Sequence, residues 1–491
     1  MTVLGVDINT GEVVELTPQA RRQGVYVIGT TGTGKTTLLQ SIAYQDMCDP
    51  SRPGLCVLDP HGDFVDDLLA CVPKHRWDDV TLFAPGDPDQ VERPLGLNLL
   101  ECDRNDPKQV YRVTSTVVET LRKLFSYSWG PRMEDLLRHS ILTLMETPGT
   151  TLLDLLLLLA SPDHRVRYTA ELTDPVLRHF WEVQFAAYDK RSLVEVVGSS
   201  LNKIGRFLAN PLIRNVVAQS RSAFDMRTIM DEGRILLVNL SKGDLGEENS
   251  HLLGAILVNL VLIAALQRRE ISPTRRRPFH LIVDEFQNFA TESFATLQSE
   301  ARKYAIDVIV AHQYRDQLDE LTKGSTLNVA NLIVMRVSGK DSHELASQFD
   351  NTPPPPERKM EPLYQRYGLS DAGEPLYITF FSPEGVGTLF REVELPRRLY
   401  SDVEAETANR LTVMGNYQAV CRLVSEGKLV ERTIRTLIPQ GVRDPAAAEY
   451  IRQRSLALGK DQGEVKAEIE TRMGKKLVFA EIQDFEQVTD G

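Results

Sequence analysis

A short apolar run at residues 25–28 leads directly into a glycine-rich loop, and a helix pattern follows at residues 37–44. The loop fits the P-loop pattern of two spaced glycines followed by lysine and threonine, here Gly29, Gly34, Lys35 and Thr36. A strand, a loop and a helix in this order surround phosphate oxygens with backbone N–H groups and a helix N-terminus. The stretch therefore predicts a nucleotide site, and we expect the rest of the chain to be organised around it.

Each residue type in the loop has a task in such a site. Gly32 and Gly34 are expected to take positive φ angles, which let the backbone approach the phosphates. Lys35 can reach the β- and γ-phosphates, and the Thr36 hydroxyl can ligate a magnesium ion. The predicted nucleotide-binding residues are Gly29, Thr30, Thr31, Gly32, Thr33, Gly34, Lys35, Thr36 and Thr37. ATP and Mg²⁺ are therefore the expected substrate and cofactor.

A second apolar strand candidate, residues 279–283, ends in two carboxylates, Asp284 and Glu285. Transfer of a phosphoryl group to water needs a metal, an oriented water and compensation for developing charge. Asp284 is the predicted second group of the magnesium site, and Glu285 is the predicted general base. Gln313 follows the strand candidate at residues 307–310, where the ligand crevice of a parallel sheet opens. It is predicted to hydrogen-bond the γ-phosphate, and the alternative is a polar strand-end residue that satisfies a loop.

Arg302 lies on the helix expected between the acidic pair and that last strand. Its guanidinium can stabilise the transition state at the nucleotide of a neighbouring subunit, so it completes the predicted catalytic set of Lys35, Glu285, Gln313 and Arg302. The alternative is an ordinary salt-bridge partner on a helix surface. Lys303 and Arg315 are nearby rivals for the same role.

Strand candidates separated by helical stretches predict βαβ units, and therefore an α/β fold with a mostly parallel sheet. Besides those already named, they lie at residues 55–58, 80–83, 234–240, 331–337 and 376–381. Residues 4–8 and 12–16 predict a hairpin at the start of the chain. The pattern after residue 399 indicates a polar helical region.

The chain has 491 residues, more than one core usually supports, so we divide it into parts. Residues 1–100 and 226–400 are predicted to form the two halves of the α/β motor. Residues 101–225 repeat apolar positions at helical spacing and predict an all-α insertion. Residues 401–491 form an accessory C-terminal region.

The formal net charge of −12 argues against a surface coated with nucleic acid, but it permits a local basic channel. The stretch at residues 196–224 has no acidic residue and carries four cations, Lys203, Arg206, Arg214 and Arg221. It is either a solvated helix face or a surface that contacts nucleic-acid phosphates.

Two apolar runs, residues 152–160 and 252–266, are shorter than the roughly 20 residues that a membrane span needs, and we expect both to be buried helices. No signal peptide precedes the P-loop, and the five cysteines are widely spaced. These features predict a cytoplasmic protein with reduced thiols and no stable membrane insertion.

Six motifs can be compared with a known family: GTTGTGKTT at 29–37, LDPHGD at 58–63, WGPRMEDLLR at 129–138, ILLVNLSKGDLGEENSHLLG at 235–254, HLIVDEFQNF at 280–289 and MRVSGKDSHELA at 335–346. This set resembles the HerA and FtsK branch of P-loop motors, and within it the conjugative coupling proteins of the VirD4, TraG and TraD type. The resemblance implies a RecA-like motor, interrupted by an all-α domain, that forms a ring, usually a hexamer, and moves DNA through its channel. It also implies that ATP lies between subunits.

By position, the resemblance assigns the phosphate and magnesium residues to Lys35 and Thr36, and the second acidic motif to Asp284 and Glu285. It likewise implies that Gln313 senses the γ-phosphate and that Arg302 acts across the subunit interface.

Coupling proteins usually carry N-terminal transmembrane helices, whereas the P-loop begins here by residue 29. We therefore expect a soluble relative that pumps DNA for a nuclease, a relaxase or a defence effector. Two alternatives remain open. One is a VirB4-like ATPase that powers protein export or pilus assembly, which DNA-independent hydrolysis would favour. The other is a nucleotide-gated scaffold that recruits a nuclease or another effector, which survival of function without hydrolysis would favour.

Overall fold

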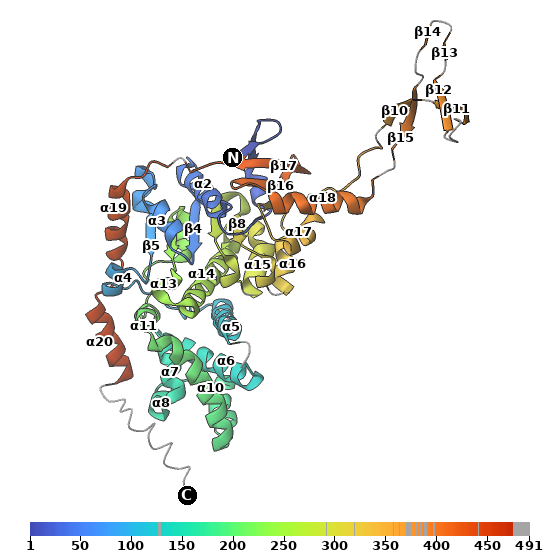
Figure 1. Ribbon diagram of the computed structural model, residues 1–491. Helices are drawn as coiled ribbons and strands as arrows, with labels where there is room; N and C mark the ends of the chain where they lie inside the picture. The colour runs from blue at the N-terminus through green and yellow to red at the C-terminus, as the bar shows by residue number, and fades with distance from the viewer. Residues whose placement is uncertain are drawn as a thin grey trace. The chain divides into compact units, whose positions relative to one another are not determined.

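The computed structural model describes residues 1–125, 129–290, 292–318, 320–356, 358–362, 364–369, 375–379, 381–382, 385–386, 390–395, 398–439 and 441–474. The chain divides into two compact units (Figure 1). The first consists of Met1–Met335 and Gly415–Gly491, and the second is Arg336–Met414. The predicted division at residues 100, 225 and 400 remains a prediction.

The first unit is built on an 11-stranded sheet of order β2-β1-β17-β16-β9-β3-β8-β7-β4-β6-β5. The strands from β9 to β5 in this order are parallel to one another. They are β3 (Val25–Ile28), β4 (Gly54–Asp59), β5 (Val80–Phe83), β6 (Ile235–Asn239), β7 (Phe279–Val283), β8 (Ile306–His312) and β9 (Asn331–Val334). Every residue of β3, β4, β7, β8 and β9 is buried, as in a parallel sheet covered on both faces. The predicted α/β fold with a mostly parallel sheet is confirmed.

Helices from distant parts of the sequence cover this sheet. Helices α2 (Lys35–Cys48), α3 (Asp63–Leu69) and α19 (Pro445–Leu456) contribute Ile42, Phe64 and Ile451 to one hydrophobic core with the strands. Helix α12 (Met226–Glu232) contacts β4, and α14 (Glu247–Gln267) packs against α12 and α15 (Glu292–Glu300). The strands thereby gain the two-sided cover that their continuous apolar runs require.

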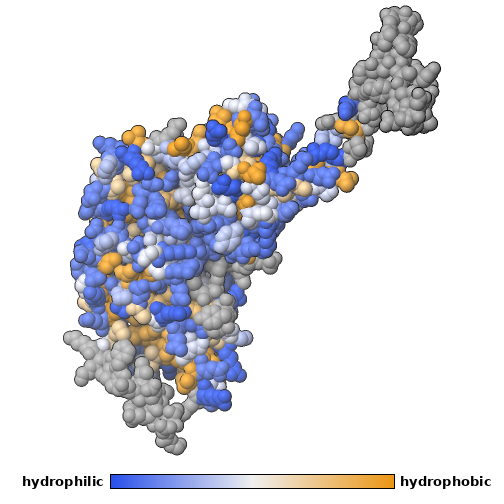
Figure 2. Space-filling view, in the orientation of Figure 1, coloured by the Kyte–Doolittle hydropathy of each residue, from blue (hydrophilic) through white to orange (hydrophobic). Residues whose placement is uncertain are grey.

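Helix α14 is the one helix in the described part of the chain that is long and apolar enough to span a membrane. It carries apolar residues all around its axis, and 72% of its apolar window is buried inside the protein. On the face shown in Figure 2, the described residues of the first unit are mostly hydrophilic, with hydrophobic residues in scattered groups. The predictions of buried helices at residues 152–160 and 252–266 are confirmed as α7 (Leu152–Ala160) and α14.

Between β5 and β6, the described residues form helices and no strand. The longest are α5 (Pro107–Leu124), α6 (Pro131–Met145) and α10 (Lys190–Ala209), which pack together with α7 and are followed by α11 (Pro211–Val217). Asp106, Thr151, Asp189 and Asn210 each accept a hydrogen bond at a helix N-terminus, which fixes where these helices begin. The expected helical insertion is present.

The C-terminal segment contains strands that the sequence did not predict. Beside the expected helices, β16 (Gln418–Ser425) and β17 (Lys428–Thr436) form a hairpin that extends the main sheet. Strand β16 pairs with β9, and β17 pairs with β1 (Thr2–Asp7). The predicted N-terminal hairpin of β1 and β2 (Val13–Leu16) is confirmed, but it joins the sheet through the C-terminal segment.

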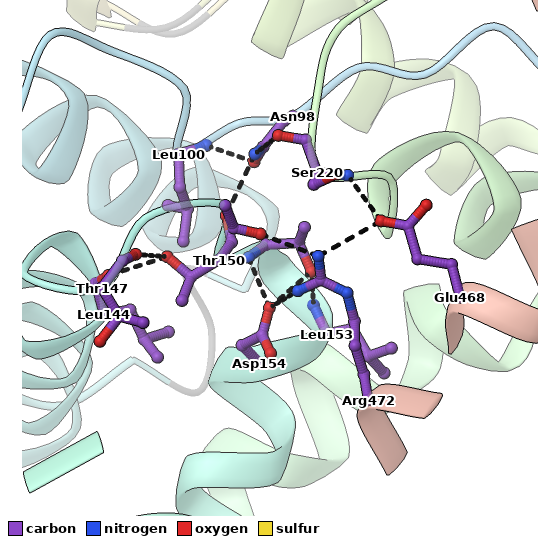
Figure 3. A network of polar contacts seen from close by, with 12 residues as sticks. Asn98, Leu100, Leu144, Thr147, Thr150, Leu153, Asp154, Ser220, Glu468 and Arg472 are labelled. Atoms are coloured by element: carbon purple, nitrogen blue, oxygen red, sulfur yellow. Dashed lines mark hydrogen bonds and ion pairs between the residues drawn. The ribbon is translucent and has the colours of Figure 1, made fainter. Parts of the chain in front are cut away.

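The last described helix, α20 (Gln462–Met473), docks on the helical insertion (Figure 3). Arg472 Nη1 lies 2.5 Å from Asp154 Oδ2, and Arg472 Nη2 donates to the Gly149 carbonyl at 2.9 Å. Glu468 on the same helix accepts a hydrogen bond from the Ser220 backbone N–H at 3.3 Å. The C-terminal segment therefore contacts both the sheet and the insertion.

In the second unit, the described residues form two helices and three strand pairs. Helices α17 (Gly339–Ala346) and α18 (Tyr400–Val413) contact each other. The strand pairs are β10 (Arg358–Pro362) with β15 (Phe390–Glu394), β11 (Tyr364–Leu369) with β12 (Pro375–Thr379), and β13 (Phe381–Ser382) with β14 (Gly385–Val386). The strand predicted at residues 376–381 thus exists largely as β12, but it pairs with its neighbour in sequence instead of joining the main sheet.

Candidate functional site

The P-loop connects the end of β3 to the start of α2. Gly32 and Gly34 take φ angles of 78° and 105°, in the left-handed region that glycine adopts without strain. Gly34 is the N-cap of α2, and it provides no side-chain hydrogen bond to the first helical N–H groups. These N–H groups and the positive end of the helix dipole are therefore available to an anionic ligand.

Lys35 folds back over the loop. Its Nζ atom donates to the carbonyl oxygens of Gly29 at 2.7 Å and of Thr30 at 3.4 Å, and the side chain is 6% exposed. Burial lowers the pKa of Lys35, while the charges of Glu285 and Asp284 oppose that shift. The ammonium group thus lies within the field of both predicted acids.

Thr36 follows β3 and Asp284 follows β7, and their side chains meet although β8 lies between these two strands. The Thr36 hydroxyl donates to Asp284 Oδ2 at 3.1 Å, and Asp284 is 3% exposed. Burial, followed by the charges of Glu285 and Asp59, raises the pKa of Asp284 to about 6. Hydroxyl and carboxylate oxygens are ligands that Mg²⁺ prefers, and a divalent cation would offset this concentration of negative charge. The residues present therefore fit a magnesium ion.

Glu285 occupies a strained backbone position directly after Asp284. Its φ and ψ angles of 44° and 49° are in the left-handed region, which is uncommon for a residue other than glycine. Glu285 Oε1 accepts a hydrogen bond from Gln313 Nε2 at 2.9 Å, and Oε2 accepts one from Gln287 Nε2 at 2.8 Å. Gln313 Oε1 in turn accepts from the Thr31 hydroxyl at 2.9 Å. Gln313 therefore connects the P-loop to the acidic pair.

These side chains meet because β3, β8, β7 and β4 are neighbours in the sheet. Parallel strands end at the same edge, and ligand sites of such sheets lie at that edge. The P-loop follows β3, Gln313 follows β8, and Asp284 follows β7. The structure thus brings together Lys35, Thr36, Asp284, Glu285 and Gln313, as their positions in the sequence predict.

Arg302 is not part of this cluster within the chain. It is an exposed residue of a short 3₁₀ turn, Ala301–Tyr304, that precedes β8, whereas Gln313 follows β8. Arg302 therefore lies at the opposite edge of the sheet from the P-loop. Its rival Arg315 is 1% exposed and donates to the Thr326 hydroxyl at 3.0 Å. A role for Arg302 at a neighbour's nucleotide remains a prediction.

Sequence reasoning assigned no role to Asp59, which ends β4 beside Asp284. Asp59 Oδ2 accepts from the backbone N–H groups of Phe64 at 2.9 Å and Val65 at 3.2 Å, at the start of α3. Burial raises the pKa of Asp59, and its charge helps to raise that of Asp284. Its position in LDPHGD, at the end of a strand, was the available signal.

Tyr417 was also missed. Its backbone N–H donates to the Thr33 carbonyl at 2.8 Å, and its ring packs on Gly34 so closely that a Cβ atom there would lie 2.7 Å from the ring. No local pattern around Tyr417 indicated a contact with the P-loop.

The cations of residues 196–224 do not form one exposed face. Lys203 is 8% exposed, donates to the Ser199 hydroxyl at 2.7 Å and lies 5.8 Å from the centre of the Phe125 ring. Arg214 donates to the Leu208 carbonyl at 3.0 Å. Arg206, on the surface, pairs with Glu248 at 3.1 Å. Two of the four cations therefore serve the packing of the insertion itself.

Known proteins share this architecture. The conjugative coupling protein TrwB, as the unbound form TrwBdeltaN70, has a TM-score of 0.59 and 16% identity, with 91% of each chain covered. TrwB in complex with ADP and Mg²⁺ has a TM-score of 0.58 and 16% identity, with 88% of this chain and 89% of that chain covered. VirB4 of Thermoanaerobacter pseudethanolicus has a TM-score of 0.53 and 12% identity, with 89% and 96% covered. At these identities, the likeness shows a common fold.

No curated protein matches the sequence. The family model for the type IV secretion-system coupling protein DNA-binding domain matches residues 8–349, which is more than half of the chain. The chain therefore belongs to the family of type IV secretion-system coupling protein DNA-binding domains.

Proposed function

We propose that this protein is a ring-forming ATPase that couples hydrolysis of Mg-ATP to the movement of DNA. The observation that carries the proposal is the hydrogen-bonded link from Thr31 through Gln313 to Glu285, beside the Thr36–Asp284 pair. The residues proposed as phosphate cradle, metal ligands, general base and phosphate sensor lie at one edge of the sheet. This is the set that phosphoryl transfer to water requires.

In the proposed reaction, the phosphates of ATP bind the N–H groups at the start of α2. Lys35 exchanges its bonds to the Gly29 and Thr30 carbonyls for the phosphate oxygens. Thr36 and Asp284 would hold Mg²⁺, which neutralises charge on the phosphates when bound. Glu285 accepts a proton from the attacking water, and its fixed backbone position keeps the carboxylate at the strand end.

Gln313 connects the nucleotide to the rest of the motor. Its amide already bonds Glu285 on one side and Thr31 on the other, so a γ-phosphate entering between them competes for these hydrogen bonds. Loss of the γ-phosphate restores the bond to Glu285. The state of the nucleotide is thereby transmitted to the end of β8, which carries Gln313.

Membership of a DNA-binding family supports DNA as the substrate that is moved. We propose that identical subunits, six in the usual ring of such motors, surround the DNA and that ATP binds where two subunits meet. Arg302 of one subunit would then stabilise the transition state at the neighbour's nucleotide, which its exposure permits. A nuclease, a relaxase or a defence effector would receive the DNA in the cytoplasm.

The test compares hydrolysis and assembly in the same protein. We expect Mg-ATP to promote rings and DNA to stimulate hydrolysis, at low and at moderate salt. Hydrolysis that is indifferent to single- and double-stranded DNA would contradict DNA movement and favour an ATPase for protein export. A protein that stays monomeric at high concentration with Mg-ATP would contradict the ring.

A further inference from the structure

A pocket of about 370 Å³ opens beside the first turns of α2. Helix α2 lines it with Thr37 and Gln40, helix α3 lines it with Asp67, and the C-terminal segment lines it with Tyr417, Ile438 and Arg443. Thr37 follows directly on Thr36, the magnesium residue of the P-loop. The pocket therefore borders the first turn of α2, next in sequence to the magnesium residue.

The Tyr417 ring is held in place by its own backbone. Tyr417 takes a φ angle of 61°, in the left-handed region, directly before β16. Its N–H group donates to the Thr33 carbonyl at 2.8 Å, and its carbonyl accepts from the Thr436 N–H at 2.9 Å. One side of the ring packs against Gly34, while 43% of the residue stays exposed. The ring is thus fixed at the end of the P-loop, and part of its surface remains accessible to a ligand.

Polar groups on another side of the pocket are also fixed. Gln40 Nε2 donates to Asp67 Oδ2 at 2.9 Å, and Arg443 Nη2 donates to Asp67 Oδ1 at 2.5 Å. A ligand would meet an aromatic ring and the apolar Ile438 side chain beside a carboxylate, an amide and a guanidinium. Ligand pockets typically combine an apolar lining with a few placed polar groups in this way.

We propose that this pocket binds the nucleoside half of the nucleotide and that Tyr417 stacks on a purine base. The inference rests on the proposed function, because it takes the P-loop as the phosphate site. The nucleoside is joined to the α-phosphate, so it lies beside the first helical turn, where Thr37 borders the pocket. A volume of about 370 Å³ is near the lower end of the roughly 300–1,000 Å³ of ligand sites, which suits one half of a nucleotide.

The assignment gives the C-terminal hairpin a place in nucleotide binding. Tyr417 lies just before β16, and Ile438 lies just after β17. The same segment continues to α20, where Arg472 contacts Asp154 of the insertion (Figure 3). Base recognition and docking on the insertion thus involve one continuous segment.

The experiment measures the binding of Mg-ATP and of inorganic triphosphate to the full chain by calorimetry. Tyr417→Gly removes the ring, tolerates the positive φ angle and keeps the N–H bond to Thr33. We expect it to weaken ATP binding about 5- to 150-fold, as loss of one base–aromatic stack does, and to leave triphosphate binding within about twofold. Tyr417→Phe should bind both ligands like the wild type.

Ile438→Ala provides a second variant, because Ile438 is 72% exposed and its truncation leaves the fold intact. It should weaken ATP binding by a few-fold and leave triphosphate binding unchanged. Unchanged ATP affinity in both Tyr417→Gly and Ile438→Ala overturns the inference, as does an equal loss for ATP and triphosphate. If the wild type binds neither ligand, the proposed function itself fails, which is a different result from normal triphosphate binding in all variants.

Discussion

Gln313 Nε2 donates to Glu285 Oε1 at 2.9 Å, so that the side chain after β8 directly contacts the acid after β7. The same amide accepts a hydrogen bond from Thr31 of the P-loop at 2.9 Å. One uncharged side chain therefore connects the loop that follows β3 to the predicted general base. Gln313 bonds both Thr31 and Glu285, whereas Glu285 is the predicted base. Substitutions at these two residues should therefore affect hydrolysis in different ways.

Glu285→Gln should abolish turnover and preserve nucleotide binding. The amide keeps the size of the side chain and one of its two acceptor oxygens, but it cannot accept a proton from water. We expect phosphate release to fall at least about 100-fold, the range for loss of a general base, while the affinity for ATP changes little. Glu300→Gln on α15 is the matched control and should hydrolyse ATP normally. Retention of near-normal hydrolysis by Glu285→Gln would remove this residue from the mechanism.

Gln313→Ala should reduce the stimulation of ATP hydrolysis by DNA. The variant loses the link between Thr31 and Glu285, so we expect DNA-stimulated hydrolysis to fall by about tenfold or more, roughly the 1.4 kcal/mol that one hydrogen bond contributes. Basal hydrolysis should fall less. The exposed Gln317, changed to Ala, serves as the control. If DNA stimulates Gln313→Ala and the wild type equally, Gln313 only satisfies the hydrogen bonds of the loop and does not transmit the state of the nucleotide.

The stability of the fold should depend on pH through a buried ionic cluster at the opposite edge of the sheet. His280 lies 3.0 Å from Asp46 and 3.1 Å from Asp307, and Arg21 bonds Asp46 at 2.5 Å. Burial and Arg21 oppose protonation of His280, but the two carboxylates outweigh them and raise its pKa. Burial also opposes ionisation of Asp46, yet Arg21 and His280 lower its pKa to about 2.

The two shifts define a pH window. The stabilisation from His280 is fully present below its unfolded pKa of about 6.5 and is lost as the pH rises through the raised value. The stabilisation from Asp46 is present above about pH 4 and is lost as the pH falls through about 2. From these groups, the melting temperature should be highest between about pH 4 and 6.5. His280→Gln should lower the free energy of unfolding by about 3 kcal/mol within that window and by less at higher pH. The exposed His75, changed to Gln, should leave the free energy of unfolding unchanged. An equal loss at all pH values would contradict the ionic explanation.

Arg472→Ala should weaken the docking of α20 on the insertion, where Glu468 still accepts a hydrogen bond from the Ser220 backbone. Asp154 is 2% exposed and also accepts hydrogen bonds from the Tyr168 hydroxyl and from the Thr151 backbone, so it keeps partners when Arg472 is lost. We expect a loss of about 2 kcal/mol, typical of a hydrogen bond to a charged group, and faster hydrogen exchange in α20. Lys466→Ala on the same helix is exposed and should leave both unchanged. Unchanged exchange in Arg472→Ala would show that α20 is held by other contacts.

Local patterns predicted much of the sheet and part of the site. The P-loop, β7 and β8 each combine an apolar run with a polar end, and parallel strands bring those ends together, so the meeting of Asp284 with Thr36 could be expected. Asp59 was missed because its position depends on the pairing of β4 with β7, which no local pattern specifies. Arg302 lies before β8, at the opposite edge of the sheet from the P-loop, so its predicted role at a neighbour's nucleotide stays a prediction.

The C-terminal segment was the least predictable part. Its turn at Glu426 and Gly427, both with positive φ angles, is a hairpin signal, but the polar composition around it suggested helices. Tyr417 contacts Gly34 because β16 pairs with β9, and β9 pairs with β3, the strand that leads into the P-loop. Such pairings depend on packing over the whole sheet, so no local pattern in the sequence predicts them.

The central claim is that hydrolysis moves DNA, and it can be measured directly as displacement of streptavidin from biotinylated single- and double-stranded DNA. We predict ATP-dependent displacement from at least one DNA form by the wild type, and none by Glu285→Gln or without ATP. If hydrolysis proceeds on DNA while streptavidin stays bound to both forms, the protein does not translocate and the account is wrong.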